Sequence, residues 1–294
     1  MKMALELQEM IKQNDWTGIS QYPELSETFI EKYADKVDWT LISEYQELSE
    51  TFIERHADKV NWRFISEYQK LSEGFIEKHA KSVDWHNISI RQQLSESFIE
   101  NYTGKVDWTL ISAYQKLSEA FIEKHADKVN WNFISKYQGL SETFIKRHAD
   151  KVNWRCIAKY QKLSEDFRKQ YGIKTPENSW LYASNEEKLK AVKQHGYSVE
   201  NGNVIAYKSC RANGYSIFNF QYRYEVGKTY TSHCDCNLGC NASFGLSAWT
   251  MERALNYCDE KLFKVSIPLE KLGAIAYGSK ELRAFEMTIL EEIG

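Results

Sequence analysis

Apolar residues recur at a fixed interval through more than half of this chain. Tryptophan returns every 23 residues without an insertion, and the leucine and phenylalanine of a Leu-Ser-Glu-x-Phe pattern keep the same interval. The repeating residues are Trp16, Trp39, Trp62, Trp85, Trp108, Trp131 and Trp154; Leu25, Leu48, Leu71, Leu94, Leu117, Leu140 and Leu163; and Phe29, Phe52, Phe75, Phe98, Phe121, Phe144 and Phe167. A fixed period of a few tens of residues is typical of stacked repeats. The pattern predicts an α-solenoid of about seven units over residues 1–172, with residues 3–13 as an N-terminal cap.

Two short helices are expected in each unit. An Asp or Asn precedes every repeating Trp, as Asp38 precedes Trp39, and its side chain can accept from the amides of a first helical turn. Trp39, Ile42 and Tyr45 then share one face of a helix of about nine residues. The second helix starts after Ser49, another favourable N-cap residue. Helices this short are unstable alone, so their stability has to come from the stacking of neighbouring units.

One position in the second helix alternates between histidine and tyrosine. His56, His79, His125 and His148 share this position with Tyr33, Tyr102 and Tyr171. A metal ligand could not be exchanged for tyrosine in alternate copies, whereas a packed flat ring could. We therefore expect these histidines to pack in the core, and we assign them no chemistry.

Positions that vary between the units are where a partner could be selected. They are the two positions after each Trp and the position before each repeating Tyr, and the fourth unit, with Ile90 and Arg91, departs most from the others. Because the constant positions build the core, we expect the variable ones to point outward. The candidate partner-binding residues are Arg63, Phe64, His86, Asn87, Ile90, Arg91, Asn132, Phe133 and Arg155.

The apolar period changes to two after a connector at residues 173–183, which predicts a separate domain at residues 184–294. Ser184 and Glu187 have capping-box spacing and open a helix through Gln194, and Asn201-Gly202 is a favoured hairpin turn. Further strands are expected at 199–207, 217–224, 228–231, 262–267 and 283–290, with a helix at 251–258. This order predicts a small α+β domain with one mostly antiparallel sheet.

Both halves of the chain resemble known viral sequence families. The units resemble the W-x-x-I…L-S-E-x-F-I repeats of bacteriophage and large-DNA-virus proteins over about 160 residues. The segments AYK, VGKTY, FGLS, LFKVSIP and KELRAFEMTILEEI resemble an uncharacterised domain common in tailed-phage proteins over about 90 residues. Most members of that family have Gly-Leu-His where this chain has Gly245-Leu246-Ser247. The resemblance implies a phage-encoded binding protein in the host cytoplasm, and by analogy a bacterial host protein, such as a defence component, as its partner.

The order of elements in the C-terminal domain is also similar to that of ADP-ribosyltransferase cores, which use NAD. This resemblance implies a catalytic set of Lys208 or Arg211, Ser247 and Glu286. A carboxylate that stabilises the ribosyl cation is the central need of such chemistry, and Glu286 is the natural candidate. Glu286 also lies on a regular strand, where an outward-facing structural residue is expected. We assign no catalytic residue, and a transferase that uses the array to target its substrate stays the alternative.

A cysteine-rich turn offers a possible metal site. His233, Cys234, Cys236 and Cys240 could supply four zinc ligands, with Cys210 or Cys258 in place of one of them. The spacing lacks the paired C-x2-C knuckles of typical zinc sites, which favours free thiols. We therefore expect no metal or other cofactor, with zinc as the alternative.

Charge is distributed unevenly, although the net charge is only −3. Residues 1–60 contain 6 Lys+Arg against 13 Asp+Glu, and residues 130–172 contain 9 against 4. Such oppositely charged ends could join head to tail, so a homo-oligomer is possible.

No apolar run is long enough for a membrane span, and the tyrosines of the second domain lack the basic surround of a nucleic-acid site, so neither a membrane nor a nucleic-acid partner is expected. No Walker loop, dinucleotide fingerprint or catalytic triad motif is present, which favours a protein-binding function over an enzyme.

Overall fold

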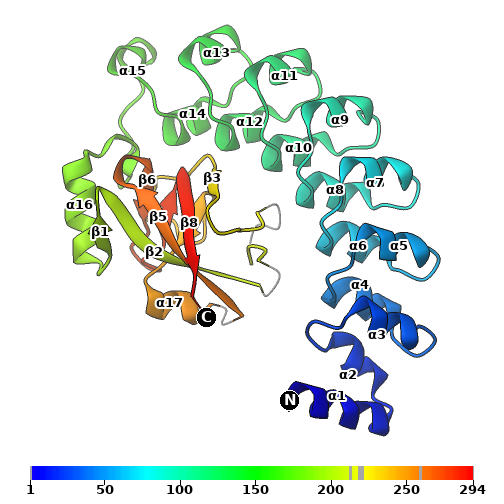
Figure 1. The fold of residues 1–294 in the computed structure, drawn as a ribbon. Helices are drawn as coiled ribbons and strands as arrows, with labels where there is room; N and C mark the ends of the chain where they lie inside the picture. The colour runs from blue at the N-terminus through cyan, green and yellow to red at the C-terminus, as the bar shows by residue number, and fades with distance from the viewer. Residues whose placement is uncertain (1, 212–213, 218–221, 258–259, 294) are drawn as a thin grey trace. The chain divides into compact units, whose positions relative to one another are not determined.

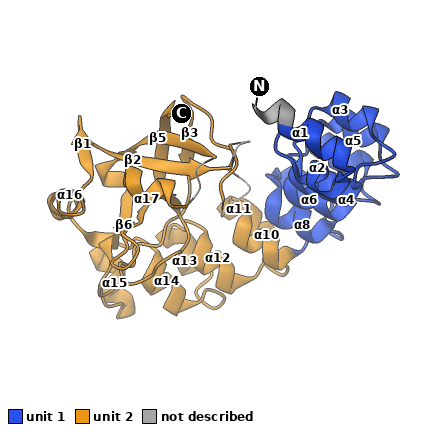
Figure 2. Ribbon diagram, turned by 90° about the horizontal axis from the view of Figure 1, so that it is seen from below, with its two compact units in different colours: residues 1–107 blue, residues 108–294 orange. Residues whose placement is uncertain are grey.

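The structure is a computed structural model that describes residues 2–211, 214–217, 222–257 and 260–293 (Figure 1). The chain divides into two compact units, residues 1–107 and residues 108–294 (Figure 2). The division lies inside the repeat array, so the last repeats and the C-terminal domain belong to one unit.

Every repeat consists of a first helix, called helix A here, that begins at the Trp and a second helix, helix B, that begins after the Leu-Ser pair. The A helices are α2 (Trp16–Gln21), α4 (Trp39–Tyr45), α6 (Trp62–Tyr68), α8 (Trp85–Arg91), α10 (Trp108–Tyr114), α12 (Trp131–Tyr137) and α14 (Trp154–Tyr160), after the cap helix α1 (Lys2–Gln13). The B helices are α3 (Glu27–Lys32), α5 (Glu50–Arg55), α7 (Glu73–Lys78), α9 (Glu96–Asn101), α11 (Glu119–Lys124), α13 (Glu142–Arg147) and α15 (Glu165–Tyr171). The predicted helical repeat array is confirmed.

The predicted caps and the ring position are also confirmed. Asp38 accepts from the amides of Thr40 and Leu41 at the start of α4, and Ser49 accepts from the Phe52 amide at the start of α5. The His56 ring packs 4.6 Å from the Trp39 ring and 4.7 Å from the Phe52 ring, and Tyr102 and Tyr171 occupy the same position in their repeats. The A helices after the first have seven residues, where nine were expected.

The A helices end early because the next residue is a glutamine that turns into the core between repeats. Gln69, 5% exposed, accepts from the Leu48 amide at 3.0 Å. Its amide nitrogen donates to the carbonyls of Ser43 at 3.1 Å and Gln46 at 2.8 Å. One buried side chain thus satisfies three backbone groups of the preceding repeat. Equivalent bonds are made by Gln46, Gln138 and Gln161.

A serine and a glutamate make further bonds between neighbouring repeats. The Ser43 hydroxyl donates to the Trp39 carbonyl and accepts from the amide of Asn61, the N-cap residue of the next A helix. Glu27 of one repeat accepts from the Ser49 amide of the next at 2.6 Å. The glutamine, serine and glutamate of the constant motif therefore join neighbouring repeats by hydrogen bonds, in addition to the apolar stacking that the pattern predicted.

The last repeat is closed by a residue outside the array. The Tyr182 hydroxyl accepts from the Leu163 amide at 3.1 Å and donates to the Gln161 carbonyl at 3.5 Å. These are two of the three bonds that a glutamine of an eighth repeat would make, so Tyr182 partly substitutes for the missing neighbour. Ala158 stands where earlier repeats have the linking serine, and no further A helix follows that would need it.

The C-terminal domain has two antiparallel sheets. The first has the strand order β1-β2-β5-β8-β3, and the second has the order β4-β7-β6. Their strands are β1 (Ser198–Glu200), β2 (Asn203–Cys210), β3 (Thr229–Thr231), β4 (Leu246–Ala248), β5 (Lys261–Pro268), β6 (Leu272–Ile275), β7 (Leu282–Ala284) and β8 (Glu286–Glu292). The helices are η1 (Trp180–Tyr182), α16 (Asn185–Gln194), α17 (Met251–Leu255) and η2 (Leu269–Lys271). The predicted α+β class is confirmed.

Several details of this domain differ from the expectation. One sheet was expected, but the predicted strand at 283–290 is broken at Phe285 and contributes β7 and β8 to different sheets. β4 and β6 were missed, because three or four residues are too few to show a period. The predicted strand at 217–224 falls partly outside the described residues, and its described residues, 217 and 222–224, belong to no strand. The helix expected at 251–258 is α17, which already ends at Leu255. The capping box at Ser184 and the Asn201-Gly202 hairpin are present as predicted.

Candidate functional site

The variable positions of the A helices differ in exposure. The first position after each Trp is exposed, but the second is partly or fully buried, because it packs toward the array. Arg63, His86, Asn132 and Arg155 are exposed, and Phe64, Ile90, Arg91 and Phe133 are partly exposed. Asn87 is only 7% exposed, so the expectation that it points outward was wrong. The fourth repeat, which varies most, uses Arg91 in an ion pair with Glu67 of the preceding repeat at 3.3 Å.

A tyrosine position at the end of the A helices recurs through the repeats, and we call it the tyrosine column. It is occupied by Tyr22, Tyr45, Tyr68, Tyr114, Tyr137 and Tyr160, and Arg91 replaces the tyrosine in the fourth repeat. Tyr45 and Tyr114 are 52% and 49% exposed, which places them among the most exposed large hydrophobic side chains of the described residues. The column was treated from the sequence as part of the helix face that packs inward, and its exposure is a correction.

Two members of the column hold an aromatic side chain of the C-terminal domain. The Phe244 ring lies 4.9 Å from the Tyr137 ring in an edge-on arrangement and 5.4 Å from the Tyr160 ring. The Lys136 ammonium lies 4.7 Å from the centre of the Tyr137 ring and 5.7 Å from that of Phe244. Two tyrosines of successive A helices and a flanking lysine therefore make a clip for one aromatic ring. We call this arrangement the aromatic clip.

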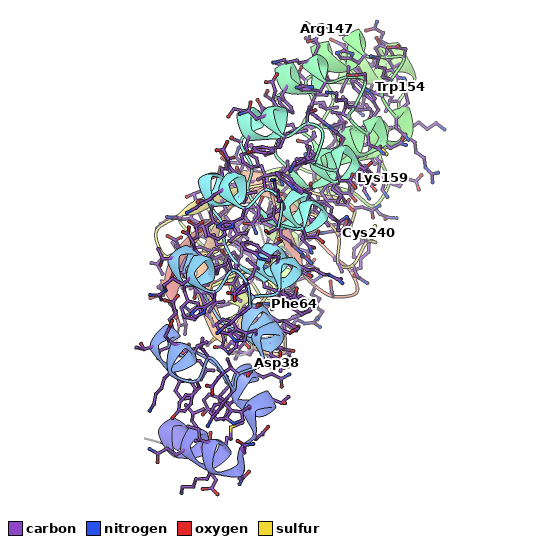
Figure 3. The ribbon with its side chains drawn as sticks, turned by 90° about the vertical axis from the view of Figure 1, so that its right-hand side faces the viewer. Asp38, Phe64, Arg147, Trp154, Lys159 and Cys240 are labelled. Carbon is purple, nitrogen blue, oxygen red and sulfur yellow. The ribbon has the colours of Figure 1, made fainter. Side chains whose placement is uncertain are left out.

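The loop that carries Phe244 adds polar contacts to the clip. The His233 ring stacks on the Phe244 ring, with 5.8 Å between the ring centres. Burial lowers the pKa of His233 to about 4, so the ring is neutral near pH 7. Lys159, labelled in Figure 3 with Phe64 and Cys240, lies close enough to Asp235 of this loop for the carboxylate to help raise the lysine pKa, after the larger effect of the Tyr160 hydrogen bond.

The four residues considered for zinc do not converge. Cys234 is buried against Gly273 and Gly245, where an added Cβ at Gly273 would overlap its sulfur, whereas the adjacent His233 faces the array. Within the described residues, no group of three or more His, Cys, Asp or Glu side chains could hold a metal ion. Cys210, Cys236 and Cys240 form no disulfide bond, and Cys258 lies outside the described residues. The geometry therefore gives no support to the zinc alternative.

The residues proposed for ADP-ribosyl transfer are only partly brought together. The Lys208 ammonium lies 2.9 Å from the Ser247 hydroxyl in the core, and burial lowers the lysine pKa. Lys208 pairs with Phe263, which pairs with Glu292 at the far end of β8 from Glu286. The seven residues from Glu286 to Glu292 span about 20 Å of strand. Glu286 therefore does not join Lys208 and Ser247 in one site. Arg211 follows the last residue of β2 and so lies at the same end of that strand as Lys208.

Two other features of this domain were not foreseen. Arg283 and Asp235 form an ion pair at 3.6 Å although both side chains are buried, and Asp235 also accepts from Ser243 and the Asn237 amide. The pair joins β7 to the cysteine-rich turn and has a structural role. No sequence signal marks it, because the two residues are 48 positions apart.

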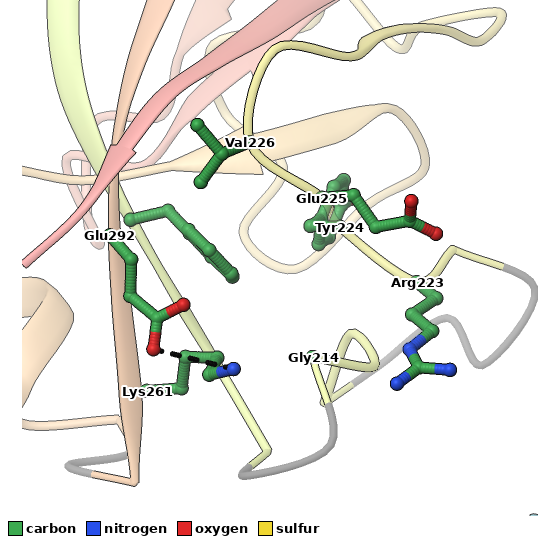
Figure 4. Close-up of a pocket in the computed structure, with 8 residues that line it drawn as sticks. Gly214, Arg223, Tyr224, Glu225, Val226, Lys261 and Glu292 are labelled. Carbon is green, nitrogen blue, oxygen red and sulfur yellow. Dashed lines mark ion pairs between the residues drawn. The ribbon is translucent and has the colours of Figure 1, made fainter.

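A polar pocket of about 430 Å³ lies beside the ends of β5 and β8 (Figure 4). Lys261 and Glu292 form an ion pair of 3.3 Å on its wall, and Tyr224 and Phe263 form its apolar part. Arg223 and Glu225 also line it, so its charges balance. The lining favours neither an anion nor a cation, and we assign the pocket no ligand.

Comparison of the chain with protein-family models, with curated proteins and with solved structures finds no match. No helix among the described residues has the length and apolar character to cross a membrane. The functional argument therefore rests on the geometry of the array.

Proposed function

We propose that this chain is a protein-binding protein whose repeat array presents the A-helix face, with its tyrosine column, to a protein partner. The observation that carries the proposal is the aromatic clip, in which Tyr137 and Tyr160 hold Phe244. The same column continues in other repeats, where Tyr45 and Tyr114 are half exposed. Tyrosines supply large contact area at low entropic cost and are enriched where proteins bind each other.

The viral resemblance of the repeats supports a bacterial host protein as the partner, and a defence component is the partner class that we propose first. On this proposal the chain is phage-encoded and works in the host cytoplasm as an inhibitor or adaptor. An interaction function needs no catalytic residues, in agreement with the separation of Glu286 from Lys208. The transferase alternative has no observation in its favour beyond the order of elements.

Affinity purification from a bacterial lysate tests the proposal. The full chain is compared with the double variant Tyr45→Ala/Tyr114→Ala and with Tyr277→Ala, which removes a 58% exposed tyrosine of the C-terminal domain as a matched control. We expect a protein that is retained by the wild type and the control but lost with the double variant. If all three forms retain the same proteins, or none retains any, the proposal is wrong.

A further inference from the structure

A lysine of the C-terminal domain is buried beside a serine. Lys208 of β2 is 2% exposed, and its Nζ lies 2.9 Å from the Oγ of Ser247 in β4. The rings of Trp249 and Tyr224 cover the same nitrogen, with their centres 5.1 and 5.5 Å from it. Among the described residues the serine hydroxyl is the one hydrogen-bond partner of Nζ, and no carboxylate forms an ion pair with it. Lysines are almost never buried without a charged partner, so this arrangement is unusual.

The surroundings of Lys208 favour its neutral form. An ammonium that is removed from water without a carboxylate partner loses more hydration energy than an amine does. Burial is accordingly the largest influence on the pKa of Lys208 and lowers it, while Cys210 and Glu281 act more weakly in the opposite sense. A neutral amine has a lone pair, so the Ser247 hydroxyl can donate to Nζ. In this arrangement a lysine can act as the general base for a serine nucleophile.

Ser247 can be reached from solvent. It is partly exposed, although its neighbours Leu246 and Ala248 are buried. Arg283 is its partner in the pairing of β4 with β7, so the two side chains leave the same face of the sheet. The buried Nε of Arg283 has no hydrogen-bond partner among the described residues. A guanidinium at this place favours the negative charge that develops on a carbonyl oxygen during acyl transfer.

We propose that Ser247 is the nucleophile and Lys208 the general base of a site that hydrolyses carboxylic esters with a small acyl group. The Ser247 Oγ forms a bond to the carbonyl carbon while its proton passes to the Lys208 Nζ. The bond to the alcohol oxygen then breaks, and the alcohol leaves with that proton. Water attacks the acyl-serine in the same way, so the carboxylic acid is released and the hydroxyl of Ser247 is restored. This activity is additional to the proposed protein binding, and neither depends on the other.

A fluorophosphonate probe and p-nitrophenyl acetate test the inference on the full chain. The probe reacts with activated serines, and peptide mass spectrometry locates the adduct. We expect the adduct on Ser247, together with hydrolysis of p-nitrophenyl acetate that the probe inhibits. Ser232 is also partly exposed, but its hydroxyl donates to the His233 carbonyl, so it should stay unlabelled.

Variants separate the roles of the two residues. Ser247→Ala should abolish both labelling and hydrolysis. Lys208→Arg keeps a donor beside Ser247 but cannot accept a proton near neutral pH, so labelling should slow by about a hundredfold. Lys208→Met, with an apolar side chain that suits the core, should show the same loss. Ser232→Ala is the control and should react as the wild type does, and urea unfolding shows whether each variant is folded.

An unlabelled Ser247 in the wild type, equal labelling of Ser232, or wild-type rates in a folded Lys208 variant overturns the inference. If neither Lys208 variant folds, the pH dependence of labelling in the wild type decides. Because the base is a lysine with a lowered pKa, the rate should level off below pH 10. A rate that continues to rise through pH 10.5, the usual pKa of lysine, contradicts the role of Lys208.

Discussion

Substitution of Gln69 by alanine should destabilise the array strongly, because this buried side chain bonds to three backbone groups of the preceding repeat. The change removes bonds to the Leu48 amide and to the Ser43 and Gln46 carbonyls. Each net hydrogen bond contributes about 1 kcal/mol, and a buried group left without a partner costs about 1–3 kcal/mol. We therefore expect the free energy of unfolding to fall by about 3–5 kcal/mol.

Urea unfolding monitored by tryptophan fluorescence measures this effect. With a slope of about 2 kcal/mol per molar urea, the midpoint should fall by roughly 2 M, or an early transition of the flanking repeats should separate from the rest. Hydrogen exchange should show lost protection of the Leu48 amide. Lys70→Ala, at the exposed next residue, is the control and should leave the midpoint unchanged. If Gln69→Ala and Lys70→Ala unfold at the same urea concentration, the glutamine does not join the repeats as argued.

Further predictions concern the end of the array, the clip and the charged ends. Tyr182→Phe should lower stability by about 1–2 kcal/mol and expose the Leu163 amide to hydrogen exchange, whereas unchanged exchange would contradict the closing role of the hydroxyl. Burial lowers the pKa of His233 to about 4, so the neutral ring contributes fully to folding stability above pH 6.5, and this contribution is lost as the pH falls toward 4. The free energy of unfolding should drop by up to about 3 kcal/mol over that range. His233→Gln should flatten this dependence of stability on pH. Phe244→Ala should speed proteolysis of the connector at 173–183, and a cleavage rate equal to that of the wild type would refute the clip's docking role. Sedimentation should show an oligomer at low salt that dissociates as salt is raised if the oppositely charged array ends associate, and a monomer at low salt would refute that association.

The array could be predicted from the sequence because its signals are local and repeated. Asp38, Ser49 and Trp39 specify caps and core within a few residues of one another, and seven copies make the pattern plain. Gln69 was not recognised as a core residue, because a polar letter between apolar ones is usually exposed, although its recurrence in successive repeats was a usable signal. The role of Tyr182 could not be predicted, since it depends on the meeting of a connector with the last repeat.

The candidate site was predicted less well for a related reason. Exposed positions such as Arg63 were identified, but exposure does not show which surface binds. The aromatic clip depends on Phe244, 84 residues beyond Tyr160, and no local pattern connects them. Likewise, the break at Phe285 that separates β7 from β8 is decided by the pairing of two sheets and not by the alternation of residues 283–290.

Site-specific photo-crosslinking from the tyrosine column tests the central claim most directly. A benzophenone amino acid is placed at position 45 of the full chain, and at position 277 as a similarly exposed control, in bacterial lysate. The account predicts one dominant protein that is crosslinked from position 45 and not from position 277. Crosslinking to the same proteins from both positions, or none from position 45, would contradict the claim that the A-helix face binds a protein partner.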